Sequence, residues 1–286
     1  MHVRQSAFGL FATLLLAAGA APMTGCGGDD STNNDGTTGD NGGNGGLNGN
    51  NGIADSIGSV RIGMAISPDM MSLGYEAATT VFAAFYSEPQ VGDFTGSVAT
   101  GCTTSTGDST TNTGNTDTTP PTYVSAGDVT ITVGDKTATQ TWDGSLYVGS
   151  TQTSKWFTGG EDISVEAAGD TVPAFSGDFK APHVFTFTSD LTTMKTGSDY
   201  SLKWTNGAAS EQIMFTLTNP SRKTATVCIF DSGKGTGTIP GKELTALGTG
   251  DAILAAFVSS ATRVTVGANK VDLNASATYM DKVTIN

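Results

Sequence analysis

Few residues in this sequence have the types and spacing that catalysis or metal binding requires. There are two histidines, His2 and His183, and three cysteines, Cys26, Cys102 and Cys228. After the N-terminal segment His183 is the one histidine, which cannot build a multi-histidine metal site, and the cysteines and histidines do not cluster in the sequence, so we expect no metal and no cofactor. A Ser-His-Asp hydrolase would have to use His183 as its base, and no serine stands in the G-x-S-x-G pattern of a nucleophile elbow. We therefore predict no catalytic residues.

Two further patterns could indicate nucleotide binding or glycoside hydrolysis, but neither is specific enough to predict that function. The run Gly233–Gly237 reads GKGTG, but a phosphate-binding loop needs a glycine where Cys228 stands, so we expect no nucleotide. Glu161, Asp162, Glu166 and Glu211 could supply the carboxylate pair of a glycoside hydrolase. The chain has 27 acidic residues, so such a pair can always be chosen, and an extracytoplasmic hydrolase stays only as a second alternative.

One stretch has the composition of a ligand-binding surface. Trp142, Asp143, Tyr147, Trp156 and Phe157 lie close together among Ser, Thr and Gly residues. Sugars stack on aromatic rings while carboxylates accept bonds from their hydroxyl groups, so this stretch is a candidate glycan site. The alternative, which we prefer, is that both tryptophans are packing residues, and burial of both rings would exclude the glycan platform.

The N-terminal segment has the pattern of an export signal. Arg4 precedes an apolar run over residues 7–21, and Pro22 follows the run directly. A basic start followed by an apolar stretch of this length is typical of a secretory signal. The competing interpretation is a transmembrane helix, but the run is shorter than the ~20 apolar residues that a bilayer requires.

The residues that close this signal, Met23-Thr24-Gly25-Cys26, resemble the lipobox of bacterial lipoproteins, with Met23 in place of the usual Leu. The resemblance implies that residues 1–25 are removed, that Cys26 is acylated with palmitate-type chains, and that the lipid membrane is a partner. Gly27 after the cysteine implies passage to the outer membrane rather than retention at the inner one. The alternative is an ordinary secretory signal that is cut nearby, with Cys26 as a bystander.

Residues 26–57 form a linker of Gly, Asn, Asp, Thr and Ser, which we expect to be a disordered tether because it cannot bury a core. The formal net charge is −13, which argues against nucleic acid as a partner. If Cys26 is lipidated, Cys102 and Cys228 are an even pair in an oxidising compartment. We predict a disulfide between them, with free or intermolecular thiols as the alternative.

Period-two alternation of apolar and polar residues recurs along the rest of the chain. It predicts strands over residues 60–66, 129–133, 200–205 and 213–218. Runs that are apolar on both faces, 81–86 and 253–258, fit either central strands or short helices. Asn206-Gly207 and Gly267-Ala268-Asn269 predict hairpin turns, and Gly241–Leu247 predicts a helical turn after Pro240. Strands of five to seven residues at this spacing favour an all-β protein made of sandwiches.

We expect two β-sandwich domains, residues 58–181 and residues 182–286. The first carries a Thr-rich insert at 103–122, for which disorder is the default expectation. The run from Tyr200 through Trp204 to Cys228 resembles immunoglobulin-like or fibronectin-like modules, with Trp204 in the core. The segment 231–247 is similar to one in uncharacterised lipoproteins of Gram-negative bacteria. These resemblances imply a fold and a location, and no activity.

The sequence therefore favours a membrane-anchored extracytoplasmic lipoprotein with a non-catalytic structural, adhesive or binding role. The alternative is a glycan-binding surface lipoprotein that uses the stretch from Trp142 to Phe157. Expected partners are the lipid membrane through acylated Cys26, and polysaccharide or another surface protein.

Overall fold

The protein is built almost entirely of β-strands. A computed structural model describes residues 56–90, 99–106 and 121–286. Its helices are α2 (Pro68–Ser72), α3 (Gly241–Leu247) and the short 3-10 helix η1 (Ser232–Lys234). No helix within the described ranges has the length and apolar character needed to cross a bilayer. The all-β prediction is confirmed, and α3 forms where a helical turn was predicted after Pro240.

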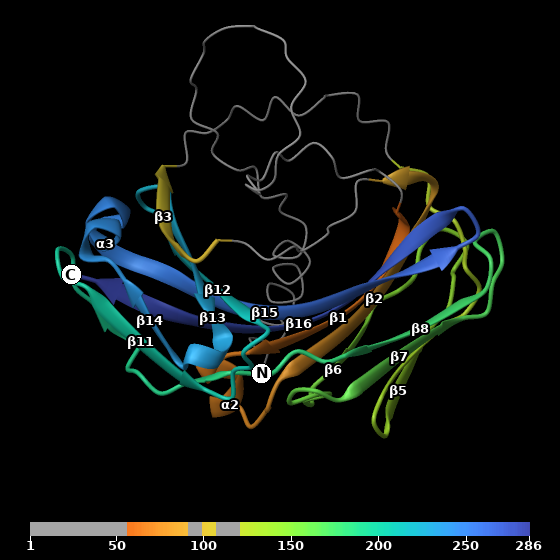
Figure 1. The fold of residues 1–286 in the computed structure, drawn as a ribbon, viewed down its shortest axis with the longest axis horizontal. Coiled ribbons are helices and arrows are strands. Elements are labelled where there is room, and N and C mark those ends of the chain that lie inside the picture. The colour runs from red at the N-terminus through yellow and green to blue at the C-terminus, as the bar shows by residue number, and fades with distance from the viewer. Residues whose placement is uncertain (1–55, 91–98, 107–120) are drawn as a thin grey trace, which may run out of the picture.

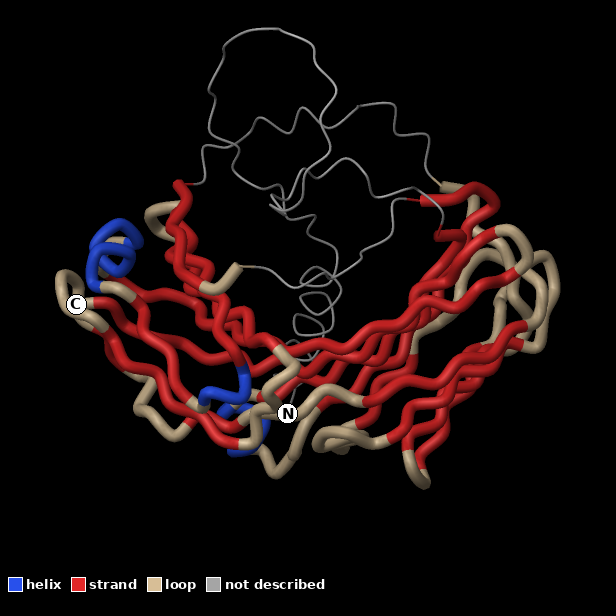
Figure 2. The backbone as a smooth tube through the Cα atoms, in the orientation of Figure 1, coloured by secondary structure: helices blue, strands red, loops and turns tan. Residues whose placement is uncertain are grey.

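A nine-stranded sheet runs through the whole molecule (Figures 1 and 2). Its strands are, in spatial order, β3 (Gly101–Thr106), β13 (Thr224–Asp231), β12 (Gln212–Asn219), β15 (Gly250–Val266), β16 (Asn269–Ile285), β1 (Ser56–Ile66), β2 (Ala78–Gln90) and β6 (Ser150–Gln152). The ninth, β10 (Thr193–Met194), pairs with β16 beyond the end of β1. β1 and β16 run parallel, so the first described strand of the chain pairs with the last one.

The hairpin of β15 and β16 forms the centre of this sheet. Each strand has 17 residues, and the pairing runs without a shift from Gly250 with Ile285 to Val266 with Asn269. The turn needs a left-handed residue, which Gly267 supplies with φ of 63°. The predicted hairpin is confirmed, but its strands are far longer than the expected five to seven residues. The small residues Ser259, Ser260 and Ala261 continue the pairing with β16, although the alternation of buried and exposed residues stops there.

Two smaller sheets pack against the two ends of the long sheet. One consists of β5 (Lys136–Gln140), β4 (Val129–Val133), β7 (Asp162–Ala167) and β8 (Phe175–Lys180). The other consists of β14 (Thr236–Ile239), β11 (Tyr200–Thr205) and β9 (Thr186–Phe187). We call the end under the four-stranded sheet the first lobe and the end under the three-stranded sheet the second lobe. Both are sandwich-like, and both use part of β15 and β16 (Figure 1).

The two lobes do not coincide with the predicted division of the chain at residue 182. β1 and β2 precede that position and pair in one sheet with β16, which follows it. β3 also precedes it and pairs with β13 of the second lobe. The position therefore does not separate two sheets, because sheet pairing joins strands from distant parts of the chain.

A second correction concerns the turn at Asn206-Gly207. Asn206 has the expected left-handed backbone, with φ of 65°. The strands on its two sides are not a hairpin, because β11 belongs to the three-stranded sheet and β12 to the long one. A Cβ on Gly207 would lie 2.1 Å from the carbonyl oxygen of Ser232, so glycine allows the chain to cross closely there. The turn passes the chain from one layer to the other.

Aromatic rings fill the core of the second lobe. Phe187 packs edge-on against Trp204, Phe215 and Tyr279, with ring centroids 6.5, 6.0 and 5.3 Å away. Trp204 is buried, and its indole N–H donates to the carbonyl oxygen of Ser232 at 2.7 Å. The prediction that Trp204 is a core residue is confirmed, and its buried polar group has a partner.

Cys102 and Cys228 form the predicted disulfide. They stand directly opposite each other in the pairing of β3 with β13, and their sulfurs are bonded. Thr103–Thr106 continue β3, so the first residues of the Thr-rich insert are a paired strand rather than a disordered loop. The remainder of the insert at 107–120, the linker up to residue 55 and the lipobox with Cys26 lie outside the described residues.

Candidate functional site

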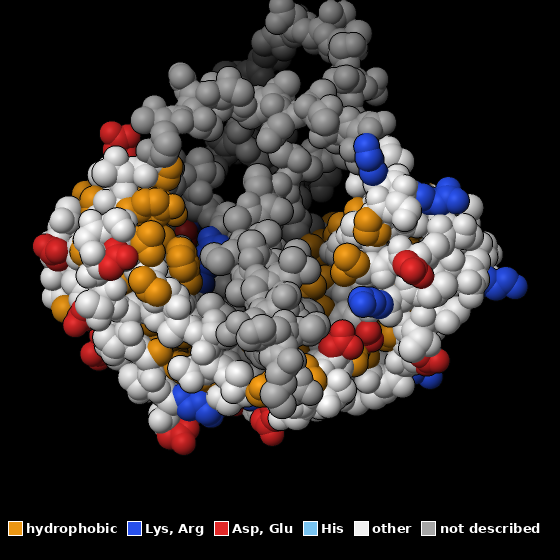
Figure 3. All heavy atoms as spheres, turned by 180° about the vertical axis from the view of Figure 1, so that it is seen from behind, with side chains coloured by type: hydrophobic (Ala, Val, Ile, Leu, Met, Phe, Trp, Pro, Cys, Tyr) orange, Lys and Arg blue, Asp and Glu red, His pale blue; other side chains and the backbone are white. Residues whose placement is uncertain are grey.

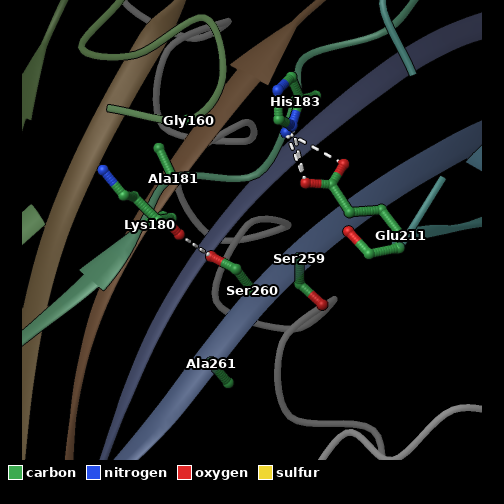
Figure 4. Close-up of a pocket in the computed structure, with 9 residues that line it drawn as sticks. Gly160, Lys180, Ala181, His183, Glu211, Ser259, Ser260 and Ala261 are labelled. Atoms are coloured by element: carbon green, nitrogen blue, oxygen red, sulfur yellow. Dashed lines mark hydrogen bonds and ion pairs between the residues drawn. The ribbon is translucent and has the colours of Figure 1, made fainter. Parts of the chain in front are cut away.

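The candidate site is a pocket at the junction of the two lobes, with a volume of about 450 Å³ (Figure 4). Residues from the loops of both lobes and from the middle of β15 line it: Gly160, Lys180, Ala181, His183, Ser210, Glu211, Ser259, Ser260 and Ala261. The lining combines small residues with serine hydroxyl groups, one imidazole, one lysine and one carboxylate.

The pocket exists because β15 changes neighbours at this point. β12 pairs with β15 only over residues 253–257, and from Val258 onward β16 is the one described strand that pairs with it. β8 approaches the open edge from the other sheet, and the Ser260 hydroxyl donates to the carbonyl oxygen of Lys180 at 2.6 Å. The space between the start of β12 and the end of β8 is left as the pocket.

His183 and Glu211 form the main polar contact of the pocket. The Glu211 carboxylate accepts from the backbone N–H of His183 at 3.1 Å, and its Oε1 lies 3.0 Å from His183 Nδ1. Because a carboxylate only accepts, Nδ1 donates its hydrogen in this contact, and Nε2 is the other ring nitrogen. The Glu211 side chain is 14 % exposed and that of His183 is 44 % exposed, so the imidazole is reachable from solvent.

Gly159 allows the imidazole to occupy this position. A Cβ on Gly159 would lie 2.6 Å from His183 Cα and 2.7 Å from a ring carbon. Gly159 also has φ of 143°, which side chains rarely adopt. A Cβ on Gly160 would lie 3.6 Å from Nε2, which is an ordinary contact distance, although its φ of 81° also favours glycine. Gly159 is therefore the residue that leaves room for the ring.

Lys180 brings a positive charge to the rim of the pocket. Its ammonium lies 2.7 Å from the Asp162 carboxylate, and both side chains are well exposed. Such an exposed pair contributes little to stability, and the ammonium can exchange partners at small cost. In Figure 4 the Lys180 side chain points away from His183 and Glu211.

The chemistry of this arrangement is that of a base without an activated nucleophile. A His–carboxylate pair is the second half of a hydrolytic triad, and the first half is a hydroxyl bonded to the other ring nitrogen. No hydroxyl within the described residues makes that bond to Nε2. Ser232, which stands in the run Asp231-Ser232-Gly233, is fully buried. The pocket can bind a small polar molecule through hydroxyl, imidazole and ammonium groups.

Glu161, one of the four carboxylates named for a glycosidase, stabilises a loop. Burial raises the pKa of Glu161, but hydrogen bonds from the Thr158 hydroxyl and from the N–H groups of Thr158 and Gly159 outweigh it, so the pKa is lowered. A general acid in glycoside hydrolysis needs the opposite shift. Glu161 therefore stabilises the loop that leads to Gly159-Gly160.

The aromatic stretch proposed for glycans does not form a platform. Tyr147, Trp156 and Phe157 are buried, with Trp156 only 5 % exposed, so these rings cannot stack on a sugar. The Tyr147 hydroxyl donates to the carbonyl oxygen of Gly127 and accepts from the N–H of Ala126, both at 2.7 Å. These three rings pack in the core of the first lobe, as the packing alternative predicts.

The two remaining members of the stretch lie near the surface. Trp142 is partly buried against Tyr147, with ring centroids 5.3 Å apart. Hydrogen bonds from the N–H groups of Leu146 and Ser145 lower the pKa of Asp143, whose carboxylate braces this turn. This turn therefore presents one partly buried ring and a carboxylate that is already hydrogen-bonded, which is a poor arrangement for binding a sugar.

Charged side chains are scattered on the face seen in Figure 3. Acidic and basic groups lie among neutral ones there, without one dominant patch. The GKGTG run enters η1 and then strand β14 rather than a helix, so its backbone does not have the strand-to-helix geometry of a phosphate-binding loop.

Comparison with known proteins gives little. No family model matches the sequence, and no curated protein matches it. Among solved structures, a Ca²⁺-stabilised adhesin with which an Antarctic bacterium binds ice is 13 % identical, with a TM-score of 0.20 over 81 % of this chain and 50 % of that one. A 1.5-MDa bacterial ice-binding adhesin is also 13 % identical, with a TM-score of 0.21 over 80 % of this chain and 66 % of that one. The chain thus spans less than two thirds of either adhesin structure, and these scores transfer neither fold nor function.

Proposed function

We propose that this protein is an exported, lipid-anchored β-sandwich protein whose folded part has a non-catalytic structural, adhesive or binding role. The observation that carries the proposal is the disulfide between Cys102 and Cys228. Disulfides persist in oxidising compartments outside the cytoplasm. The bond also occupies two of the three cysteines, so Cys26 is the one that remains for acylation after the apolar run.

The anchor is tested by metabolic labelling of the full chain with radioactive palmitate in a bacterial host. Label should enter the unaltered chain and the Cys102→Ser/Cys228→Ser variant, and it should not enter Cys26→Ser. Equal labelling of Cys26→Ser, or no labelling of the unaltered chain, contradicts the anchor. Fractionation of the labelled cells then compares the outer with the inner membrane.

The binding role is assigned to the inter-lobe pocket in preference to the aromatic stretch. The pocket combines the exposed imidazole of His183, the exchangeable ammonium of Lys180 and serine hydroxyls, whereas the rings of the stretch are mostly buried. Titration with neutral sugars and sugar acids tests it by calorimetry. Binding that is lost in His183→Ala and kept in Trp142→Ala supports the pocket, and the reverse pattern supports the aromatic stretch.

A further inference from the structure

The segment between β1 and β2 exposes apolar side chains that the core does not use. This tip, Ser67–Tyr75, contains α2, and no residue of α2 is buried. Met71 is 52 % exposed and Leu73 is 65 % exposed, which places both among the most exposed large apolar residues of the described chain. Core packing therefore does not explain why this segment is apolar.

The tip is nevertheless held in one conformation. The Ser67 hydroxyl accepts from the N–H of Met70 at 3.2 Å, which caps the start of α2. At its end, the N–H groups of Leu73, Gly74 and Tyr75 donate to the carbonyl oxygens of Met70 and Met71 at 3.0–3.1 Å. Gly74 takes a left-handed φ of 84° that closes the turn. Met71 and Leu73 are thus presented by an ordered backbone, which reduces the entropy lost on binding.

The chemistry of the tip fits an uncharged apolar surface. Within Ser67–Tyr75 the one ionisable charge at neutral pH is Asp69, exposed Glu76 follows directly, and the segment between β1 and β2 has no Lys or Arg. A tip that bound anionic lipid or an acidic protein would need basic residues. Met, Leu and Tyr side chains instead suit the boundary between head groups and acyl chains.

The position of the tip along the chain also fits a lipid surface. β1 carries the chain from Ser56 to Ile66, and eleven strand residues span about 36 Å. A Gly-rich chain of the length between Cys26 and Ser56 has an expected r.m.s. span of about 30 Å and reaches at most about 100 Å. The acylated cysteine and the tip can therefore touch the same bilayer. A tether of this length holds the tip at roughly millimolar effective concentration, so even a weak apolar contact would be populated.

From these observations we infer that the tip Ser67–Tyr75 docks into the zwitterionic lipid surface to which the chain is tethered, with Met71 and Leu73 as the inserted residues. The inference rests on the proposed lipid anchor. In Figure 1, α2 lies at the lower side of the molecule. Docking there would fix the orientation of both lobes relative to the membrane.

The test uses the acylated full chain in phosphatidylcholine vesicles that carry brominated acyl chains. Tryptophan is introduced by Leu73→Trp, and the matched control is Ala268→Trp, which places the same probe on the exposed turn between β15 and β16. Emission is compared with that of the unaltered chain, whose own tryptophans are buried or partly buried. We expect quenching of the added emission in Leu73→Trp and not in Ala268→Trp. Adding anionic lipid should not increase the quenching.

Each outcome separates the tip from the anchor. If palmitate enters the chain and the emission of Leu73→Trp is unquenched, the tip does not insert and the inference is overturned. Cross-linking of two chains through the tip in place of quenching also overturns it, in favour of a second copy as the partner. If no palmitate enters, the anchor itself fails, and the inference falls with it.

Discussion

His183 Nδ1 lies 3.0 Å from Glu211 Oε1, and this contact joins the loop that follows β8 in the first lobe to the loop that precedes β12 in the second. Glu211 also accepts from the backbone N–H of His183, so the carboxylate bonds both the ring and the chain. The two lobes share the hairpin of β15 and β16, and this cluster is a polar connection between their loops beside that hairpin. The pocket residues therefore have a structural part in addition to any ligand that they bind.

Loss of the Glu211 carboxylate should loosen this connection. We expect Glu211→Ala to lower the free energy of unfolding by about 1–3 kcal/mol, because the N–H and Nδ1 of His183 lose a charged acceptor that is mostly shielded from water. Urea denaturation of the purified protein measures this loss. Glu166→Ala is the matched control, because Glu166 is an exposed acid on β7. An equal effect of the two substitutions would show that Glu211 is an ordinary surface acid.

The disulfide should contribute strongly to stability because it closes a long loop. Cys102 and Cys228 are separated by 126 residues, and in the chain-entropy model a loop of about 100 residues corresponds to about 4–5 kcal/mol. We expect Cys102→Ser/Cys228→Ser to unfold about 2–5 kcal/mol more easily, and reduction of the unaltered chain to have the same effect. Thiol titration in denaturant checks the bond directly. Two reactive thiols from this pair in the unreduced protein would refute it.

The local structure of this protein could be predicted from its sequence, but the pairing of its strands could not. Alternation decides which face of a strand is buried, so β4, β11 and β12 lie where the pattern placed them. Which strand pairs with which depends on contacts between distant residues. The parallel pairing of β1 with β16 has no local signal in the sequence. It places strands from both predicted domains in one sheet. Long β15 and β16 were also missed, because their central small residues resemble a break.

The same reason limits prediction of the candidate site. In the sequence, His183 is one of two histidines and Glu211 is one of 27 acidic residues. Their contact requires two lobes to meet beside β15, which no spacing of residues reports. The Gly159-Gly160 pair was the available signal, because adjacent glycines often mark a close approach of two segments. In the aromatic stretch, composition alone could not distinguish a sugar platform from a core.

Tyr279 should make the protein less stable in alkali. Burial of the ring raises the pKa of Tyr279. The Asp281 carboxylate, which accepts a hydrogen bond from the Tyr279 hydroxyl at 2.9 Å, raises this pKa further. The unfolded chain releases this proton near pH 10, whereas the folded chain keeps it to higher pH. The stabilisation is therefore complete below about pH 10 and is lost as the pH rises through the folded pKa. Urea denaturation at about pH 8 and about pH 10.5 measures the slope.

Two variants isolate this contribution. Tyr279→Phe should reduce the alkaline loss of stability, and Asp281→Asn should reduce it by a smaller amount, because the ring stays buried but loses the neighbouring charge. Tyr147 and Tyr200 also have raised pKa values, chiefly through burial, so part of the slope should remain in both variants. An unchanged slope in Tyr279→Phe would contradict the assignment to this residue.

Gly177 should be required for the close contact between β8 and the long hairpin. A Cβ at this position would lie 2.5 Å from Val264 Cγ1 and 2.6 Å from Leu273 Cδ1, so in Gly177→Ala these two side chains must shift within the packed first lobe. We expect a loss of about 1–3 kcal/mol in the free energy of unfolding, typical of overpacking. The Val264→Ala substitution removes one of the two clashing groups and provides a double-mutant cycle. Val264→Ala should cost less in the Gly177→Ala background than alone, with a coupling of about 0.5–3 kcal/mol. Strict additivity of the two changes would mean that β8 and β15 do not touch at this point in solution.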